Sequence, residues 1–214
     1  MLINNITESQ KQALDSVMNG RNVFITGGAG TGKTYLLHLI VEALQKQRKQ
    51  VVTCSFTNMA ALMAKGSTIH RVFGFPMGPC ISPKRKQIIT RTNKVLSATD
   101  VVIIDEISMV RIDMMDAIVA SLRKIEQEKQ KKIQIVLIGD FFQLPPVIDE
   151  ETNERYVLES YYKNDIGNGY AFLAPGWKQC NFQTVVLRET KRQSNDNVID
   201  ALNQLRKGST KCID

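Results

Sequence analysis

The stretch Val23-Phe24-Ile25-Thr26-Gly27-Gly28-Ala29-Gly30-Thr31-Gly32-Lys33-Thr34 decides the fold. Its apolar start predicts a β-strand, its glycines predict a loop, and the apolar residues that recur after it at helical spacing predict a helix. Gly27, Gly32, Lys33 and Thr34 fit the pattern G-x-x-x-x-G-K-[ST], in which backbone N–H groups surround a polyphosphate, the lysine reaches its terminal phosphates and the hydroxyl binds Mg²⁺. The helix N-terminus then points its positive end at the phosphates. Nucleotide binding is therefore the working interpretation, and an ordinary glycine-rich turn is the alternative.

The composition is that of a soluble globular protein. The chain has 214 residues, of which 43% are hydrophobic and 23% charged, and this length suits one α/β domain. A formal net charge of +7 favours an anionic partner without identifying it. The four cysteines are widely spaced and form no C-x-x-C pair, so neither a disulfide framework nor a zinc site is indicated. The start of the chain has no leader pattern, and no apolar run reaches the ~20 residues of a membrane helix, so we expect an intracellular protein, monomeric by default.

Further strands are predicted at 51–56, 101–104, 133–138 and 184–187, with helical patterns between them. The run Val101–Ile104 is apolar throughout, which is typical of a parallel strand covered on both faces. We therefore predict an α/β fold with a central, mostly parallel sheet flanked by helices. Polar residues follow several of these strands, at the edge where open α/β sheets bind their ligands.

The segments between the strands carry their own patterns. Thr7–Gln10 has the form of a capping box and predicts the start of a helix before the first strand. Residues 74–83, rich in glycine and proline, are expected to form an exposed loop. Residues 84–94 contain five cations and no acid, and predict a basic amphipathic helix. An acidic, irregular surface excursion is expected at 149–175, and a closing helix at 198–205.

Asp105 and Glu106 stand at the end of the apolar strand, where a second Mg²⁺ contact is expected. Asp105 would hold the metal. Glu106 would orient and deprotonate a water in line with the γ-phosphate, which suits an ATPase better than a kinase. The segment Asn93-Lys94-Val95-Leu96 has leucine where a guanine-specific N-K-x-D element has aspartate, so ATP is favoured over GTP. A P-loop phosphotransferase and a non-catalytic nucleotide- or DNA-binding module remain alternatives.

Taken together, these motifs resemble the 5′-to-3′ superfamily I DNA helicases of the Pif and RecD group. The resemblance covers nearly the whole chain in the right order and spacing, and it rests on Gly27–Thr34, Thr57–Ala61, Thr68–His70, Asp105–Met109, Gly139–Pro146 and Arg192–Gln193. It implies a RecA-like P-loop NTPase domain with ATP and Mg²⁺ as cofactors. It also implies single-stranded DNA and duplex or structured DNA junctions as partners, and a small strand-separating insertion at 74–95.

The resemblance also implies roles for individual residues. The catalytic residues would be Lys33, Glu106, Gln143 and Arg192. The nucleotide contacts would be Gln10, Gly28, Ala29, Gly30, Thr31, Gly32, Lys33 and Thr34, and the metal ligands Thr34 and Asp105. Gln10 resembles an adenine-reading glutamine, Gln143 a sensor of the γ-phosphate, and Arg192 an arginine finger. The alternatives are a helix cap for Gln10, a turn cap for Gln143 and a surface arginine for Arg192.

A separate set of residues would contact DNA: Thr57, Asn58, Thr68, His70, Phe73, Lys84, Arg85, Lys86 and Arg91. Backbone N–H groups at Thr57 and Asn58 would hold a phosphate, and aromatic faces at His70 and Phe73 would stack on bases. The basic residues would follow the DNA backbone. Simple N-capping, core packing of the rings and a solvated helix face are the respective alternatives.

Family members continue into a second RecA-like domain with a T-x-H-x-x-Q-G type element, which has no match here. We therefore expect a single RecA-like domain across residues 1–214, the first half of a helicase in a trimmed or truncated form. Such a domain should bind ATP, hydrolyse it slowly and unwind nothing.

Overall fold

A computed structural model describes residues 6–81 and 94–189. In this part of the chain a six-stranded sheet has the order β3-β2-β4-β5-β1-β6, and every neighbouring pair is parallel. The strands are β1 (Val23–Gly27), β2 (Val51–Ser55), β3 (Ser67–Thr68), β4 (Val101–Asp105), β5 (Gln134–Ile138) and β6 (Gln183–Leu187). The predicted α/β fold with a mostly parallel sheet is confirmed, and the two-residue edge strand β3 is an addition that no periodic pattern predicts.

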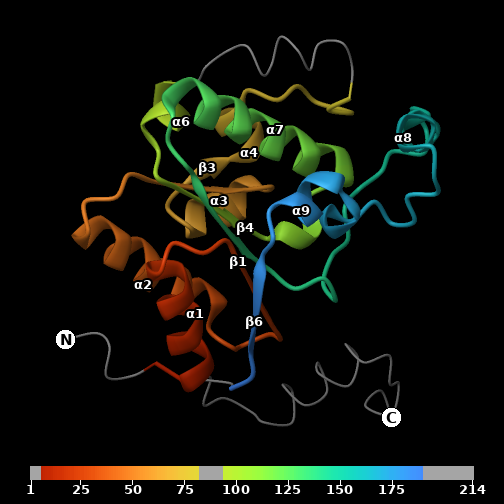
Figure 1. Ribbon diagram of the computed structural model, residues 1–214. Helices are drawn as coiled ribbons and strands as arrows, with labels where there is room; N and C mark the ends of the chain where they lie inside the picture. The colour runs from red at the N-terminus through yellow and green to blue at the C-terminus, as the bar shows by residue number, and fades with distance from the viewer. Residues whose placement is uncertain (1–5, 82–93, 190–214) are drawn as a thin grey trace, which may run out of the picture.

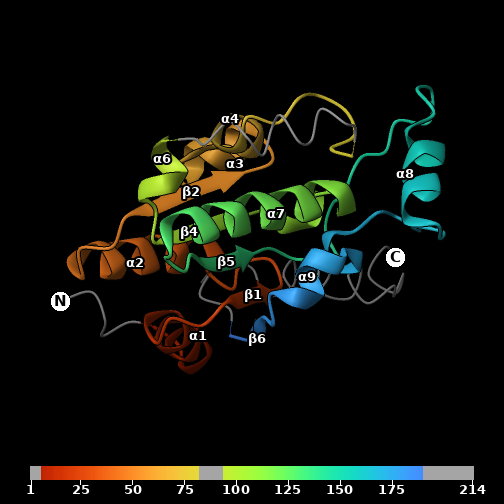
Figure 2. The same cartoon turned by 45° about the horizontal axis from the view of Figure 1, so that its top comes forward.

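Helices cover both faces of this sheet (Figures 1 and 2). They are α1 (Glu8–Met18), α2 (Lys33–Lys46), α3 (Asn58–Met63), α4 (Ile69–Phe73), α6 (Lys94–Ala98), α7 (Ile112–Lys129), α8 (Glu154–Tyr162) and α9 (Pro175–Gln179), with 3₁₀ turns η2 (Ile107–Met109) and η3 (Ala171–Leu173). One hydrophobic cluster joins the sheet to α1 and α2, and a second joins it to α4, α7 and α9.

The central strand β4 explains the two-sided burial. Val101 and Ile103 belong to the cluster under α1 and α2, while Val102 and Ile104 belong to the cluster under α7. Alternate side chains of a strand point to opposite faces, so a strand covered on both sides must be apolar at every position. The apolar run seen in the sequence thus follows from the position of β4 between β2 and β5.

Two connecting segments contain more structure than their sequence patterns predict. The 74–83 segment is not simply an exposed loop, because Phe75 and Cys80 are buried in the hydrophobic cluster under α7. The 149–175 segment is not irregular, because it contains α8 and η3 and buries Leu158. Because glycine, proline and acidic residues interrupt these two segments, the few apolar residues that attach the segments to the core form no recognisable periodic pattern.

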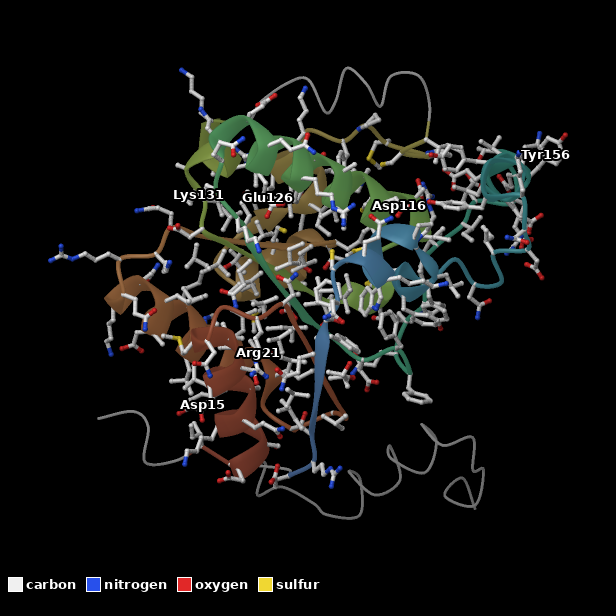
Figure 3. All side chains as sticks on the ribbon, in the orientation of Figure 1. Asp15, Arg21, Asp116, Glu126, Lys131 and Tyr156 are labelled. Carbon is white, nitrogen blue, oxygen red and sulfur yellow. The ribbon has the colours of Figure 1, made fainter. Side chains whose placement is uncertain are left out.

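The helix α8 stands away from the sheet, beside the end of α7, in both ribbon views (Figures 1 and 2). Tyr156 on this helix points away from the molecule (Figure 3) and is 73% exposed. Tyr162 at its other end donates a hydrogen bond of 2.7 Å to Asp116 on α7. The excursion is therefore a helix fixed to α7 on one side and open to solvent on the other.

The predicted basic helix at 84–94 lies outside the described residues except for Lys94, where α6 begins, and the predicted closing helix at 198–205 lies outside them entirely. Within the described ranges, no helix has the length and apolarity needed to cross a membrane.

Candidate nucleotide site

The strand order brings three motifs to one edge of the sheet. β5 pairs with β1 on one side and with β4 on the other. The carboxyl ends of parallel strands meet at the same edge, so the loop after β5 lies between the phosphate loop after β1 and the Asp105–Glu106 pair after β4. Residues that are far apart in the sequence thus converge on one site.

The phosphate loop is held by bonds of its own. Lys33 Nζ donates hydrogen bonds to the carbonyl oxygens of Gly27 and Gly28 at 2.8 and 3.0 Å. Thr31 Oγ1 donates to the Gly28 carbonyl at 2.9 Å. Gly32 precedes α2 with φ 80°, and no side chain caps this helix end. The positive end of α2 therefore faces the phosphate loop without a side-chain cap, as the sequence pattern requires.

Gln10 ties α1 to this loop. Its side chain is fully buried, its Nε2 donates to the Thr31 carbonyl at 3.0 Å, and its Oε1 accepts from the Thr7 backbone N–H at 3.1 Å. With Thr7 capping in return, the predicted capping box is present. A Cβ atom on Gly32 would lie 2.7 Å from Gln10 Nε2. The helix-capping role of Gln10 is thus observed, and its contact with adenine remains a prediction.

Asp105 is 7% exposed at the end of β4. The pKa of its carboxyl group is raised to about 6, and burial is the largest cause. The Glu106 backbone N–H, bonded to Oδ1 at 2.9 Å, and the charge of Lys33 lower this pKa, whereas the charge of Glu106 raises it. A buried carboxylate of this kind gains a partner when a cation binds. Its oxygen and the hydroxyl of the exposed Thr34 are the hard ligands that Mg²⁺ prefers alongside substrate phosphates and waters.

Those two ligands are what a magnesium–nucleotide site needs from the protein, since Mg²⁺ is commonly bound through one or two side chains plus phosphate oxygens. A dedicated cluster of three or more His, Cys, Asp or Glu side chains does not occur in the described ranges. The donor set present therefore fits a metal that arrives with the nucleotide.

Glu106 has a left-handed backbone conformation, φ 53° and ψ 46°, and begins the 3₁₀ turn η2. Left-handed conformations cost a non-glycine residue about 1–2 kcal/mol, and strain of this kind concentrates at functional sites. The turn is packed directly on the next loop, because a Cβ on Gly139 would lie 2.9 Å from the Ile107 backbone nitrogen. Glu106 thus stands at the start of a tightly held turn.

The loop after β5 begins with Asp140, which is 1% exposed and to which sequence reasoning gave no role of its own. Its Oδ1 accepts from the Phe142 N–H at 3.2 Å, and its carbonyl accepts from the Gln143 N–H at 2.9 Å. Asp140 therefore shapes the turn that carries the exposed Gln143. The available signal was its place inside the Gly139–Pro146 block.

Two of the predicted DNA-binding residues are helix caps. Thr57 Oγ1 accepts from the Ala60 N–H at 3.1 Å at the start of α3, and Thr68 Oγ1 accepts from the Arg71 N–H at 3.3 Å at the start of α4. Asn58 is exposed beside the first of these caps. The capping alternative is observed, and phosphate contacts at these positions remain a prediction.

The two aromatic residues predicted to contact DNA, His70 and Phe73, differ in how deeply they are buried. His70 is half-buried and meets the Phe56 ring edge-on at 5.8 Å between ring centroids. Phe73 is 5% exposed and stacks on Phe75 with centroids 5.3 Å apart. The core-packing alternative is therefore observed for Phe73, and stacking of its ring on a base remains a prediction.

The remaining predicted residues, Lys84, Arg85, Lys86, Arg91 and Arg192, lie outside the described residues. The last described residues, however, contact α1. Ser9 of α1 donates a short hydrogen bond to the Glu189 carboxylate and accepts from the Arg188 N–H at 3.4 Å. The chain leaving β6 is thus fixed beside the helix that carries Gln10.

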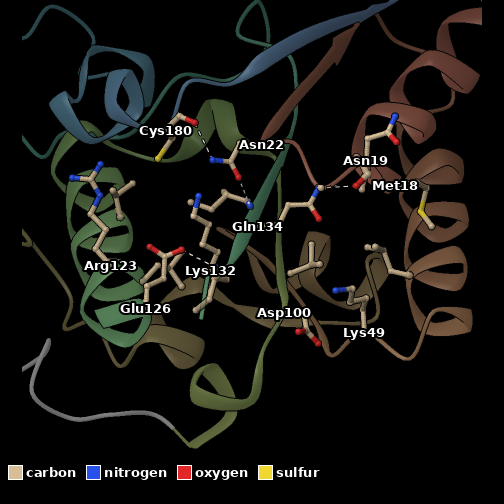
Figure 4. A pocket seen from close by; sticks show the side chains of 18 of the residues that line it. Met18, Asn19, Asn22, Lys49, Asp100, Arg123, Glu126, Lys132, Gln134 and Cys180 are labelled. Atoms are coloured by element: carbon tan, nitrogen blue, oxygen red, sulfur yellow. Dashed lines mark hydrogen bonds between the residues drawn. The ribbon is translucent and has the colours of Figure 1, made fainter. Parts of the chain in front are cut away.

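A pocket of about 800 Å³ lies at the opposite, amino-terminal edge of the sheet (Figure 4). Some of its lining residues bond one another: Asn22 Nδ2 donates to the Cys180 carbonyl at 2.9 Å, and Gln134 Nε2 donates to the carbonyl of Val17 at 2.8 Å. These bonds join the segment before β1 to the segment before β6, and β5 to α1. The pocket is lined by none of the nucleotide-site residues named above.

Comparison with known proteins places these motifs in a family. The family model described as PIF1-like helicase matches residues 5–213. The chain is similar to the ATP-dependent DNA helicase RRM3 of Saccharomyces cerevisiae, with 33% identity over 95% of this chain and 28% of the relative. It is also similar to the ATP-dependent DNA helicase Pif1 of Campylobacter jejuni, with 31% identity over 91% of this chain and 42% of the relative.

Solved structures agree with this result. A structure of two coordinating Pif1 helicases at forked double-stranded DNA has a TM-score of 0.80 and 34% identity, over 96% of this chain and 49% of that one. The Bacteroides Pif1 helicase in complex with ADP-AlF3 and single-stranded DNA has a TM-score of 0.78 and 33% identity, over 94% of this chain and 46% of that one. The chain thus spans about half the length of these solved relatives, and its RecA-like fold and the predicted helicase resemblance are confirmed. This chain belongs to the PIF1-like helicase family.

Proposed function

We propose that this chain is the ATP-binding motor domain of a DNA helicase that moves 5′-to-3′ along single-stranded DNA inside the cell. The observation that supports this most is the convergence of the phosphate loop, Asp105–Glu106 and Asp140–Gln143 at one sheet edge. Relatives with this fold include a Pif1 bound to ADP-AlF3 and single-stranded DNA and two Pif1 helicases at forked double-stranded DNA. Single-stranded DNA and DNA junctions are therefore the proposed partners.

The chemistry assigned to each residue follows from its position. The N-terminus of α2 and Lys33 would hold the β- and γ-phosphates, and Lys33 would exchange its bonds to the loop carbonyls for phosphate oxygens. Thr34 and Asp105 would hold Mg²⁺, which would neutralise charge on the phosphates. Glu106 would accept the proton of the attacking water, and Gln143 would report the presence of the γ-phosphate.

In motors of this architecture, ATP lies between two RecA-like domains, and an arginine from the far wall contributes ~10³–10⁵ to the hydrolysis rate. A polypeptide of these 214 residues is therefore expected to bind Mg²⁺–ATP, to hydrolyse it slowly with little stimulation by single-stranded DNA, and to separate no strands. Steady-state ATP hydrolysis with and without single-stranded DNA tests this expectation. Rapid, DNA-stimulated hydrolysis by the monomer would contradict it, and phosphate transfer to a small acceptor would favour the phosphotransferase alternative.

A further inference from the structure

Arg111 sits in a buried ionic arrangement that the nucleotide chemistry does not use. Its side chain is 9% exposed. Nε and Nη2 donate to the two carboxylate oxygens of Asp113 at 2.6 and 3.1 Å, and Nη1 donates to Glu154 Oε2 at 2.8 Å. Buried ion pairs are poor sources of stability compared with apolar packing of the same volume. The bonds of Arg111 to Asp113 and Glu154 instead fix the relative positions of these side chains, which suggests a positioning role for Arg111.

The two carboxylates extend this arrangement to separate segments. Asp113, which is fully buried, accepts the backbone N–H of Cys80 at 2.6 Å and so holds residues 74–81 against α7. Glu154 accepts the backbone N–H of Asp149 at 3.0 Å and fixes the start of α8. One guanidinium group therefore joins α8 to residues 74–81, the first part of the predicted strand-separating insertion at 74–95.

Arg111 is close in the sequence to the turn that begins at Glu106. Arg111 follows Glu106 by five positions, and the connecting turn is anchored by Ile107 and Val110, both fully buried. Close-packed side chains of this kind move together with their backbone instead of deforming. A displacement of the turn at Glu106 would thus displace the guanidinium group of Arg111 by a similar amount.

The turn itself carries two signs of a second arrangement. Glu106 is in the strained left-handed region. Ser108 Oγ is buried with no hydrogen-bond partner among the described residues. Buried hydroxyl groups are nearly always bonded, and an exception calls for an explanation. A rearrangement on nucleotide binding that relaxes Glu106 and gives Ser108 a partner would provide one.

Resting on the proposed function, we propose that Arg111 is a positioning residue that transmits the nucleotide state of the Glu106 turn to residues 74–81 and to α8. The route runs through Asp113 to the Cys80 amide and through Glu154 to the start of α8. Nucleotide binding would then change how firmly these two segments are held, although neither touches the nucleotide.

Hydrogen–deuterium exchange of the 214-residue chain tests the proposal, with and without a non-hydrolysable Mg²⁺–ATP analogue. In the unaltered chain, the analogue should change exchange at residues 74–81 and 149–158 by about fivefold or more, a typical size for coupling between sites. Glu154→Gln removes one charge with little change of shape, and Arg111→Lys removes the fork while keeping the charge. Both should reduce that difference to less than about twofold while nucleotide affinity stays within about threefold.

Arg155→Lys is the matched control, because Arg155 is the next residue on α8 but bonds other partners, namely Glu150 and Glu159 at 3.9 and 3.7 Å and the Gly167 carbonyl at 3.0 Å. It should keep the full nucleotide-dependent difference. If Glu154→Gln speeds exchange at these segments by the same factor with and without nucleotide, its role is merely structural and the proposal is overturned. The absence of any nucleotide effect at 74–81 in an unaltered chain that binds the analogue would also overturn it. Failure to bind the analogue would instead contradict the proposed function.

Discussion

The contact between Gln10 and Gly32 gives the most specific prediction about how the phosphate loop is held. Gly32→Ala must place a side chain at φ 80°, which costs about 1–2 kcal/mol. Its Cβ would also lie 2.7 Å from Gln10 Nε2, so the amide must move and leave the Thr31 carbonyl unpaired, at a further cost of about 1–3 kcal/mol. We predict a loss of about 2–5 kcal/mol in the free energy of unfolding, with weaker nucleotide binding.

Urea denaturation measures this loss, and the chain offers a matched control. Gly20 has φ 74° but nothing within 4 Å of the added Cβ, so Gly20→Ala should cost only the backbone term of about 1–2 kcal/mol. In a double-mutant cycle, Gln10→Ala should relieve part of the Gly32→Ala cost, with an interaction energy of about 1 kcal/mol or more. Equal costs for the two glycine variants, together with strict additivity, would refute the reasoning.

Three further predictions concern catalysis, DNA and pH. Glu106→Gln should keep ATP affinity and lower the single-turnover hydrolysis rate by ~10²–10⁴-fold, and a parallel loss of binding would refute its role as the base. Neutralising Lys84 and Arg91 should weaken single-stranded DNA binding and flatten its dependence on log salt concentration by about 1–2 units, whereas an unchanged slope would favour a solvated helix face. Burial, and then the charge of Arg111, lower the pKa of His70 below 6.5, so the unfolded chain binds more protons and stability should fall as the pH drops below 6.5. His70→Gln should flatten that fall in urea midpoints measured between pH 7.5 and 5.5, and an unaltered pH profile would exclude His70 as its source.

The parts of the fold that could be predicted are those whose cause is local. The strand β1, the glycine loop and the first turn of α2 follow from consecutive residues, and the capping box at Thr7–Gln10 spans a single turn. The continuous apolar run of β4 likewise predicts a parallel strand that is covered on both faces. In each case a short run of sequence contains the whole physical reason.

The rest depends on contacts between distant segments. The burial of Phe73 depends on the way the chain turns back after Gly74 and stacks Phe75 on it. The ion pair between Arg111 and Glu154 joins residues 43 positions apart, and no spacing rule connects them. Asp113 gives no sign in the sequence that it accepts the Cys80 N–H. Sequence patterns therefore predict the residues of the candidate nucleotide site but not the long-range contacts that hold the surrounding segments in place.

Nucleotide binding itself is the central claim, and calorimetric titration of the 214-residue chain with a non-hydrolysable ATP analogue tests it most directly. The account predicts saturable binding of one nucleotide per chain that requires Mg²⁺ and is lost or weakened at least tenfold, about 1.4 kcal/mol, in Lys33→Ala. Gly20→Ala, at the pocket on the opposite edge of the sheet, should bind as the unaltered chain does. No binding by the unaltered chain, or equal binding by the chain and by Lys33→Ala, would contradict the assignment of this sheet edge as the site of ATP.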